Sequence, residues 1–582
     1  MNGIKNRFPL TASDLVMIGG YLLLVLLVGL YYRRRMHSAE DYFAGGHSVP
    51  WWLAGVSHYM SSASALAFVS YSQVGYTYGF TAISLIWVAV PGCLAGAFIF
   101  ARQWRRARVV TPVQFMEQRF NPFVRQLLAW AGIPMKVAED GLKLFATSTF
   151  LAVGLGISVV WAVIICGVIT IVYTFLGGVW ALMVTDYIQF LMKMLALLLL
   201  VPLAVWAAGG VHHAVASMPP GFLRVTNGPY NWIYLAGWAV MLTITVNGSW
   251  SLAQKFYSVK SEREASKAAY FSAFLHLIGG PVMILPAILA RTFLPDLIAQ
   301  HRTTDVYVLL VLKLLPAGMV GIIVAAMLSA TMATVSSDFS AIASVLTKDV
   351  YQRLIRPEAT EKRMVNIGRI ITIVVGSTSL GIGLYIARGG DQSLFHLMVL
   401  LASAFIAPSF VPLLAALVSK KLNWQGVVIG YFLGLATGLT LLGMRSWYFP
   451  KGHWHWMAQN YDGAAVLINT AVTILGMAIG TMLFRSKYSE QAKYEKMFTH
   501  TGAVAQASGT GQKLEQVKVI AYASAAVGAL LCIAGLLAVA RSARVLDLVV
   551  GAALIAMGSY RVSRAQRLAA AEERELKRVH AG

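Results

Sequence analysis

Hydroxyl side chains recur along one apolar stretch, AAMLSATMATVSSDFSAIAS at 325–344. They stand at Ser329, Thr334, Ser336, Ser337 and Ser340, spacings that bring several of them onto one side of a helix. Asp186 is the single carboxylate of a second apolar stretch, 180–206. Hydroxyl and carboxylate oxygens suit a hard cation, and a carboxylate at membrane depth is costly without a function. These residues predict a cation route, although an interfacial aspartate is the alternative for Asp186.

A third apolar stretch begins with an unusually polar segment, PMKVAEDGLKLFATSTF from Pro134. Lys136 and Asp140, and likewise Glu139 and Lys143, are four residues apart and can form salt bridges on a helix. Of these four residues, Lys143 lies furthest into the apolar stretch. Its ammonium could bind an anionic ligand as a point charge, or Glu139 could already neutralise it.

Two further stretches are interrupted by Ser and Gly: SHYMSSASALAFVSYSQVGYTYG at 57–79 and TITVNGSWSLAQ at 243–254. Paired broken helices at matching places in two halves of a chain point to a binding site near the membrane midplane. The alternative is that small residues only let helices pack closely. Both breaks also expose polar backbone groups that need partners, which favours the binding site.

The composition indicates that these segments lie in a lipid bilayer rather than in water. Of 582 residues 58% are hydrophobic and 12% charged, whereas a soluble globular domain carries about 25% charged residues. Apolar runs near 18 residues or longer recur along the chain, and in lipid such runs must be helical. We therefore expect an all-α, polytopic membrane protein with about fifteen spans.

The net charge of +23 is distributed over alternate loops, which is the positive-inside pattern of a membrane protein. Nucleic acid is therefore not an expected partner, whereas the lipid bilayer is. The pattern places the N-terminus outside and the basic tail in the cytoplasm. Three cysteines, Cys93, Cys166 and Cys532, lie in apolar spans and are expected to be small buried hydrophobes.

The spans divide the chain into seven regions. Spans two to eleven form two groups of five, and an odd number of crossings makes the second group enter the membrane inverted. The expected regions are a leading helix and cytoplasmic loop at 1–49, a first repeat at 50–206, a second repeat at 207–420, two additional helices at 421–485, a flexible cytoplasmic linker at 486–517, a helical hairpin at 518–561 and a basic tail at 562–582.

Five motifs carry a family resemblance. AEDYFAGGHSVPWW at 39–52, followed by the first broken helix, resembles the sodium/solute symporter family, which includes sodium/glucose, sodium/proline and sialic acid symporters. Similar segments follow in order: TPVQFMEQRFNP at 111–122, GGVWALMVTDYIQ at 177–189, QKFYSVKSEREASKA at 254–268 and SVLTKDVYQ at 344–352. The resemblance covers about 450 residues and implies a LeuT-like five-plus-five inverted repeat with one leading and about four trailing helices. It also implies alternating access and uptake driven by a sodium gradient.

The resemblance implies a main sodium site when the segment is aligned without gaps from the TKD at 347–349. Its ligands would be the Thr334 hydroxyl and carbonyl oxygens of Met60, Ala63 and Ala330. Members of the family usually carry two adjacent hydroxyl residues here, whereas this chain has Ala333 before Thr334. One ligand is then missing, unless the register shifts to Ser329 and Thr331 or a water substitutes.

A second sodium position found in some members maps to Ser336, Ser337 and Asp186. Asp338 departs from the family pattern, because a neutral residue usually stands there. It could complete the sodium cage, accept a proton or pair with a basic group, and the sequence does not choose between these roles.

The solute is less well defined. In sialic acid symporters an arginine near the position of Lys143 binds the substrate carboxylate. Sugar symporters present acidic and amide groups where this chain has Leu66 and Ala67, which cannot hydrogen-bond through their side chains. The remaining candidates for substrate contact are Ser62, Ser64, Gln73, Asn247, Trp250 and Gln254.

The sequence therefore predicts a sodium-coupled symporter that imports a small organic solute, such as a sugar, sialic acid or another carboxylate, across the inner (plasma) membrane. We expect it to function as a monomer. A proton-coupled symporter, using Asp338 or Asp186, and a membrane solute sensor are the alternatives. An enzyme is disfavoured, because the short cytoplasmic loops carry no metal-ligand cluster, phosphate loop or nucleophile motif.

Overall fold

Helices make up nearly all of the regular structure. The computed structural model describes residues 11–33, 38–62, 65–300, 302–315, 319–388, 392–447, 454–484, 488–499, 510–538 and 541–581. Within these ranges there is no β-strand, only two isolated bridges, so the predicted all-α class is confirmed. Nine described helices are long and apolar enough to cross a membrane, and helical segments occupy each of the ranges expected to span it.

The leading helix and the first group of helices cover the first third of the chain. They are α1 (Ala12–Arg33), α2 (Ala39–Ala44), α3 (Trp51–Ser61), α4 (Ala65–Tyr78), α5 (Thr81–Trp87), α6 (Ala89–Ala95), α7 (Ala101–Arg106), α8 (Pro112–Arg119), α9 (Pro122–Leu155), α10 (Val159–Ala207) and α11 (Gly210–Ala216). Residue choice explains several boundaries: Asn121 caps the start of α9, where Pro122 occupies the first turn, and Gly156 ends it in the left-handed conformation.

α10 contains both of the spans expected at 158–177 and 180–206. They meet at a kink at Gly178, whose φ of 56° and ψ of −165° are not helical. A Cβ atom at this position would lie 2.8 Å from the carbonyl oxygen of Tyr42, so both the conformation and the close approach require glycine. The GG pair of the GGVWALMVTDYIQ motif therefore lets α2 pack against the kink.

The second group of helices follows the same order as the first. It comprises α12 (Trp232–Gly248), α13 (Trp250–Tyr257), α14 (Glu262–Phe293), α15 (Val306–Leu314), α16 (Val320–Val345), α17 (Glu361–Ala387) and α18 (Gln392–Val418). α16 lies at the centre of the bundle, where every residue from Gly321 to Val345 is buried, and it packs against α3, α9, α10 and α13. The hydroxyl stripe of the sequence is thus on the most enclosed helix of the fold.

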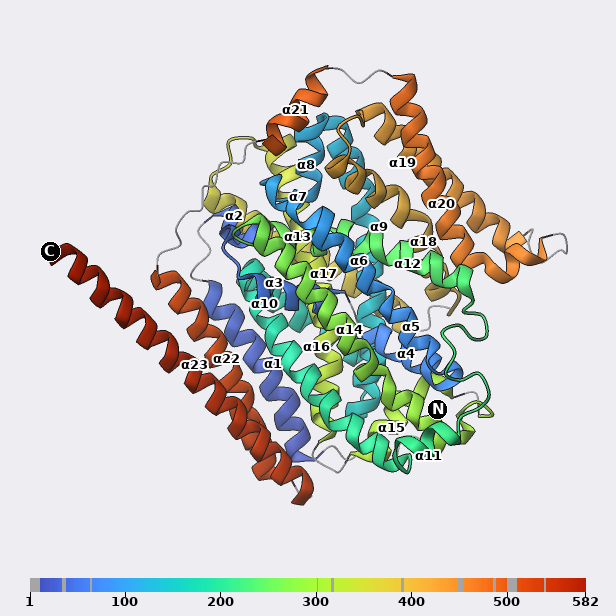
Figure 1. Cartoon of the computed structure of the whole chain (residues 1–582), viewed down its shortest axis with the longest axis vertical. Coiled ribbons are helices and arrows are strands. Elements are labelled where there is room, and N and C mark those ends of the chain that lie inside the picture. The colour runs from blue at the N-terminus through green and yellow to red at the C-terminus, as the bar shows by residue number, and fades with distance from the viewer. Residues whose placement is uncertain are drawn as a thin grey trace.

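The trailing helices flank this core on two sides (Figure 1). α19 (Trp424–Trp447) and α20 (His455–Leu483) pack together beside α18, whereas α22 (Thr510–Leu537) and α23 (Arg541–Ala581) form a hairpin against α1. Among the described residues the main contacts of α16 are instead with α1, α3, α9, α10, α13 and α17.

A short helix, α21 (Tyr488–Thr499), lies at the end of the molecule formed by α7 and α8 (Figure 1). Arg119 of α8 is fully buried and donates to four backbone carbonyl oxygens, among them that of Glu490 at 2.6 Å. Burial lowers the pKa of Arg119 to about 10. This part of the expected flexible linker is therefore a helix docked on α8. The buried Arg119 guanidinium holds it by donating a hydrogen bond to the backbone carbonyl oxygen of Glu490.

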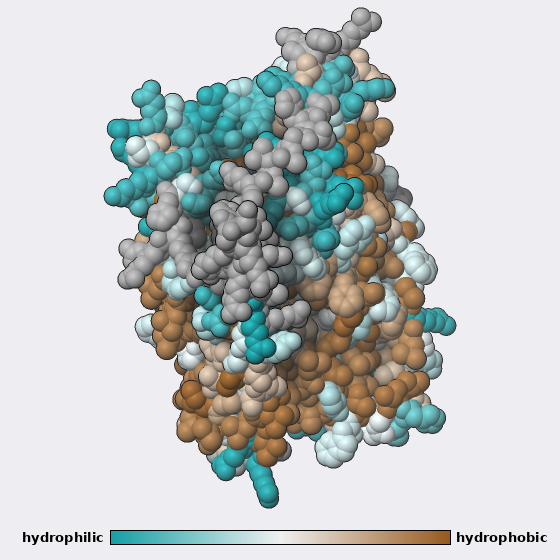
Figure 2. All heavy atoms as spheres, turned by 60° about the vertical axis from the view of Figure 1, so that its left-hand side comes forward, coloured by the Kyte–Doolittle hydropathy of each residue, from teal (hydrophilic) through white to brown (hydrophobic). Residues whose placement is uncertain are grey.

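The surface has two zones. Figure 2 shows hydrophilic residues gathered at the end of the molecule that carries α7, α8 and α21, above a broad hydrophobic belt. The polar end includes the basic residues of the loops after α7 and α13, as the positive-inside pattern predicted. The belt is the face that a bilayer would cover.

Candidate functional site

The two interrupted helices expected from the sequence are present. α3 ends at Ser61 and α4 begins at Ala65, and α12 and α13 are separated at Ser249, whose φ of −59° and ψ of 136° leave the helix. A break of this kind leaves backbone donors and acceptors without intrahelical partners. In both cases serine stands at the break, and its small polar side chain suits a site at membrane depth.

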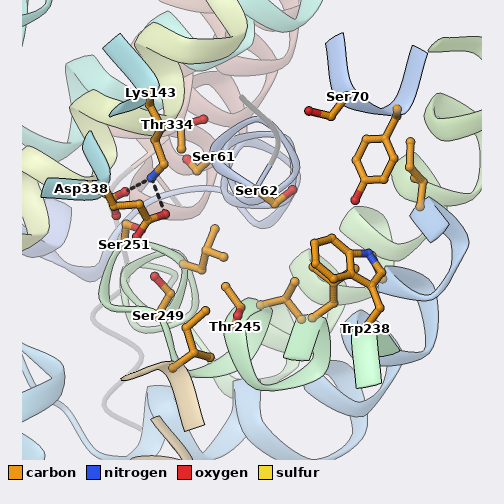
Figure 3. Close-up of a pocket in the computed structure, with 18 of the residues that line it drawn as sticks. Ser61, Ser62, Ser70, Lys143, Trp238, Thr245, Ser249, Ser251, Thr334 and Asp338 are labelled. Atoms are coloured by element: carbon orange, nitrogen blue, oxygen red, sulfur yellow. Dashed lines mark hydrogen bonds and ion pairs between the residues drawn. The ribbon is translucent and has the colours of Figure 1, made fainter. Parts of the chain in front are cut away.

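A cavity of about 880 Å³ lies between the breaks. Its wall includes Ser61 and Ser62 from the first break and Ser249 and Ser251 from the second. Figure 3 shows Thr334, Lys143 and Asp338 near one another at one side of this space, and Ser70 and Trp238 at the other. The volume is in the range of small-molecule pockets.

Of the residues of the expected main sodium site, Thr334 and Ala330 are in contact on α16. Thr334 lines the cavity, and its hydroxyl lies 3.0 Å from the carbonyl oxygen of Ala330. Two oxygens that share a hard cation at about 2.3–2.6 Å lie on the order of 3–4 Å apart, so this pair fits one ion. Met60 is buried in the last turn of α3, and Ala63 lies outside the described residues.

Two of the residues of the expected second position, Ser337 and Asp186, contact α3. The Ser337 hydroxyl lies 2.8 Å from that of Ser61, and Ser57, one turn earlier, donates to Asp186. One oxygen of Asp186 is buried with no hydrogen-bond partner. The Lys255 ammonium also donates to Ser337, at 3.1 Å, and interacts electrostatically with Asp186.

Ser336 takes a different direction from Ser337. Its hydroxyl donates to the carbonyl oxygen of Ala333 at 3.3 Å, a local bond within α16. Ser336 interacts in addition with the Tyr173 side chain of α10. Of the two hydroxyls predicted for the second position, Ser337 is the one that reaches across to another helix at the break.

A network of ion pairs joins α9 to α16. The Lys143 ammonium lies 2.8 Å from Asp338, 2.9 Å from Glu139 and 3.2 Å from Asp140, and Figure 3 marks its contacts with dashed lines. Lys136 lies 3.3 Å from Asp338 and 3.4 Å from Glu139. Two cations therefore share three carboxylates, of which Asp140 and Asp338 are buried and Glu139 is partly exposed.

This network answers two questions that the sequence left open. Of the three roles considered for Asp338, it takes the pairing with basic groups. The expected bridge between Glu139 and Lys143 is present, whereas Lys136 pairs with Glu139 in place of the expected Asp140. The difference arises because Asp140 faces Lys143 one turn later, and Asp338 from α16 takes the remaining side of Lys136.

The structure brings Ser62 and Lys143 to the cavity but directs three other predicted contact residues elsewhere. Gln73 donates to the Thr303 hydroxyl at 3.0 Å, Asn247 to the carbonyl oxygens of Gly92 and Thr243, and Gln254 to that of Phe43. Trp250 packs against α9 beside Gly132. Ser64 lies outside the described residues. Solute contact by these residues stays a prediction.

Several cavity residues were not expected. Lys193 of α10, His276 of α14 and Trp238 of α12 all line it. Lys193 carried a signal that could have been used, since a lone lysine within the apolar run FLMKMLALLLL is rare at membrane depth. The indole of Trp238 stacks on Tyr234 and donates to the Leu85 carbonyl oxygen, contacts that depend on packing between helices.

Broken helices around a central cavity, with oxygen ligands on a neighbouring helix, define an ion-coupled membrane transporter. The family model described as the sodium:solute symporter family matches residues 42–434. The sodium/sialic acid symporter NanT of Aliivibrio fischeri is 23% identical over 437 residues, covering 72% of this chain and 85% of the relative. The sodium/glucose cotransporter of Vibrio parahaemolyticus is 26% identical over 473 residues, covering 74% and 85%.

A solved structure supports the same fold. It is that of a Na+-coupled sialic acid symporter in a substrate-bound outward-open state, with a TM-score of 0.72 at 21% identity, covering 81% of this chain and 98% of that one. The chain belongs to the sodium:solute symporter family, and its LeuT-like inverted-repeat fold is confirmed. It is a multi-pass membrane protein and a sodium-coupled symporter of a small organic solute, not an enzyme.

Proposed function

We propose that the cavity between the two helix breaks is the solute site, and that Thr334 with the carbonyl oxygens of Met60, Ala63 and Ala330 holds the coupling sodium ion. The observation that carries the proposal is that Thr334 lines the cavity while it stands one turn from Ser337, which contacts Ser61 at the break. An ion bound there ties α16 to the broken helix and orders one wall of the solute site.

Coupling then follows from a difference in affinity between two conformations. Sodium favours the outward-open state, in which the broken helix is held against α16. When the protein opens inward, the ion leaves past Asp186 towards the cytoplasm. Ser336, Ser337 and Asp186 form a further ion position on this route, where Lys255 already places a positive charge. A sodium ion that enters this position must replace the bond between Lys255 and Ser337.

For the solute we propose a sugar, sialic acid or another small carboxylate. Relatives named as sialic acid and glucose symporters are similar to this chain over about three quarters of its length. The cavity offers the hydroxyls of Ser62, Thr245, Ser249 and Ser251, with Trp238 as an aromatic wall. Hydroxyls and an aromatic face suit a polar organic molecule.

Transport in proteoliposomes tests the ion site. Solute counterflow and uptake are measured under an inward sodium gradient, under a proton gradient and under neither. Thr334→Ala should raise the sodium concentration for half-maximal uptake, whereas Thr170→Ala should not. Thr170 is a matched control, because it is buried in α10 and its hydroxyl likewise donates to the carbonyl oxygen four residues earlier. Uptake that follows the proton gradient alone would overturn the assignment.

We also propose that the protein lies in the inner (plasma) membrane as a functional monomer, with the end formed by α7, α8 and α21 in the cytoplasm. Arg263 and Asp296 are exposed at opposite ends of α14. Cysteines placed at these two positions, in a Cys532→Ser background, should react with an impermeant maleimide from opposite sides of the membrane. Equal reaction from one side would exclude this orientation of α14.

A further inference from the structure

Lys193 is an intramembrane cation without a counter-charge. It lies in α10, is fully buried and lines the cavity. Among the described residues its ammonium has no hydrogen-bond partner, and no carboxylate there forms an ion pair with it. Its contacts are aromatic: the nitrogen lies 4.6 Å from the ring centre of Tyr59 and 5.2 Å from that of Phe68.

Aromatic faces stabilise a cation, but they return only part of what the ammonium loses when it leaves water. Lys143, at another wall of the cavity, shows the usual solution, since three carboxylates surround it. A buried lysine that persists without such a partner is a functional site by default. The missing partner is then an anion that the protein does not itself supply.

Hydrogen-bonding groups stand next to this ammonium. The Tyr59 ring that covers Lys193 also meets the His276 ring edge-on, with centroids 4.9 Å apart. The His276 Nε2 atom lies 2.9 Å from the Ser62 hydroxyl, and Nδ1 lies 2.8 Å from the Ser272 carbonyl oxygen. Because Nδ1 donates to that carbonyl, a neutral His276 offers Nε2 as an acceptor to the Ser62 hydroxyl, which also lies 2.7 Å from the Tyr59 carbonyl oxygen. A carboxylate that is bound by Ser62 must therefore replace one of these two acceptors.

We propose that Lys193 is the counter-ion of the solute: the transported molecule is a small organic anion whose carboxylate is bound by the Lys193 ammonium with the Ser62 hydroxyl beside it. This inference rests on the proposed solute cavity and names the chemical class of its occupant. Lys143 does not take this role, because Asp338, Glu139 and Asp140 already neutralise it.

The same geometry joins recognition to movement. Tyr59 belongs to α3 and Phe68 to α4, the two halves of the first broken helix. In the structure their rings enclose the ammonium. A carboxylate that draws the ammonium into the cavity therefore acts on both halves of that helix, at the break where the sodium ligand Met60 lies.

Ligand-induced thermal stabilisation of the purified full-length protein in detergent tests the proposal. The probes are matched acids and neutral analogues: propionate with propionamide, gluconate with glucose, and N-acetylneuraminate with N-acetylmannosamine. Each is titrated into wild type, Lys193→Met, Lys193→Arg and Lys313→Met, in sodium chloride and in choline chloride. Lys313 is the matched control, because it also lies over an aromatic ring but is exposed and outside the cavity.

At least one acid should raise the Tm of the wild type while its neutral partner does not. Lys193→Met should raise the half-maximal concentration of that acid about tenfold or more, whereas Lys193→Arg should keep part of the response and Lys313→Met all of it. The proposal is overturned if the neutral partners act as strongly as the acids, if Lys193→Met responds like the wild type, or if no acid has an effect.

The outcomes separate this inference from the proposed ion site. A Tm shift produced by sodium alone reports the ion; it should be unchanged in Lys193→Met and should need a higher sodium concentration in Thr334→Ala. If the sodium shift fails while the preference for acids holds, the ion assignment is wrong and the anion site stands. The reverse result removes the anion site and leaves the ion assignment intact.

Discussion

Two lysines line the same cavity in opposite electrostatic settings. Lys143 lies within 3.2 Å of three carboxylates and is held between α9 and α16. Lys193 touches two aromatic rings and has no hydrogen-bond partner in the ranges that the structure describes. Both are buried, so burial alone does not distinguish them. The charge of Lys143 is neutralised by carboxylates and joins two helices, whereas the charge of Lys193 is not neutralised and is available to a ligand.

The comparison also bears on Lys143 as a predicted substrate contact. The sequence shows only its local partner Glu139. Asp338 comes from a helix 195 residues away along the chain and supplies the closest contact.

Removing Asp338 should cause the largest loss. Asp338→Asn leaves Lys136 and Lys143 with one carboxylate fewer in the interior, and breaking a buried ion pair costs about 3–5 kcal/mol. We expect a lower Tm and a lower yield of folded protein. Adding Lys143→Met to Asp338→Asn should not restore stability, because Asp338→Asn already leaves two cations with two carboxylates and the second change removes the cation that pairs with Asp140. A fully stable Asp338→Asn that no longer transports would instead assign Asp338 to ion coupling.

Lys143→Met should have a smaller effect on stability, about 2 kcal/mol, because Asp338 keeps Lys136 as a partner. The binding preference for an acid over its neutral analogue should be unchanged. Thermal stabilisation with the paired ligands measures both quantities in one experiment. Loss of that preference in Lys143→Met would place the solute carboxylate at Lys143 and reverse the comparison.

Lys193→Met should change stability in the opposite direction. Without solute, the substitution removes a buried charge that has no counter-ion and replaces it with an apolar side chain of similar length, so the protein should gain about 1–2 kcal/mol. The measurement is the Tm of the ligand-free protein beside that of Lys313→Met. A Tm that falls as far as in Lys143→Met would show that Lys193 is structural.

Sodium affinity should respond more weakly still. Thr334→Ala should weaken sodium binding by about 1 kcal/mol, because it removes one oxygen from a cage that already lacks a hydroxyl at Ala333. Ala333→Ser should tighten sodium binding by restoring that oxygen. Sodium dependence of uptake is the measurement, with Thr170→Ala as the control. The two variants must change the sodium concentration for half-maximal uptake in opposite directions. If both raise it, the sodium ligand lies elsewhere on α16.

The smallest effect is expected at Gln73. Its amide donates to Thr303 at 3.0 Å, so Gln73→Ala should cost about 1 kcal/mol or less of stability and leave the half-maximal solute concentration within about twofold. Uptake titrations check this. A larger shift in apparent affinity would mean that Gln73 turns into the cavity during transport.

Local sequence was enough to predict the helices, their breaks and the hydroxyl stripe. A long apolar run is enough to predict a membrane helix. The serine and glycine residues at 57–79 and 243–254 predict its interruption whatever the tertiary packing. The contact between Thr334 and Ala330 could also be predicted, because residues four apart on one helix are neighbours in any fold. The helix α21 was missed, since a polar segment with no apolar run depends on Arg119 to dock it.

Only the tertiary structure decided which polar side chains face the cavity. Gln73, Asn247 and Gln254 had the right chemistry, but they satisfy backbone or side-chain partners on other elements. Asp338 and Lys193 could be found as charges in apolar helices, yet the sequence does not say that one meets two lysines and the other two aromatic rings. Periodicity is a property of one helix, whereas the partner of a buried charge depends on how several helices cross.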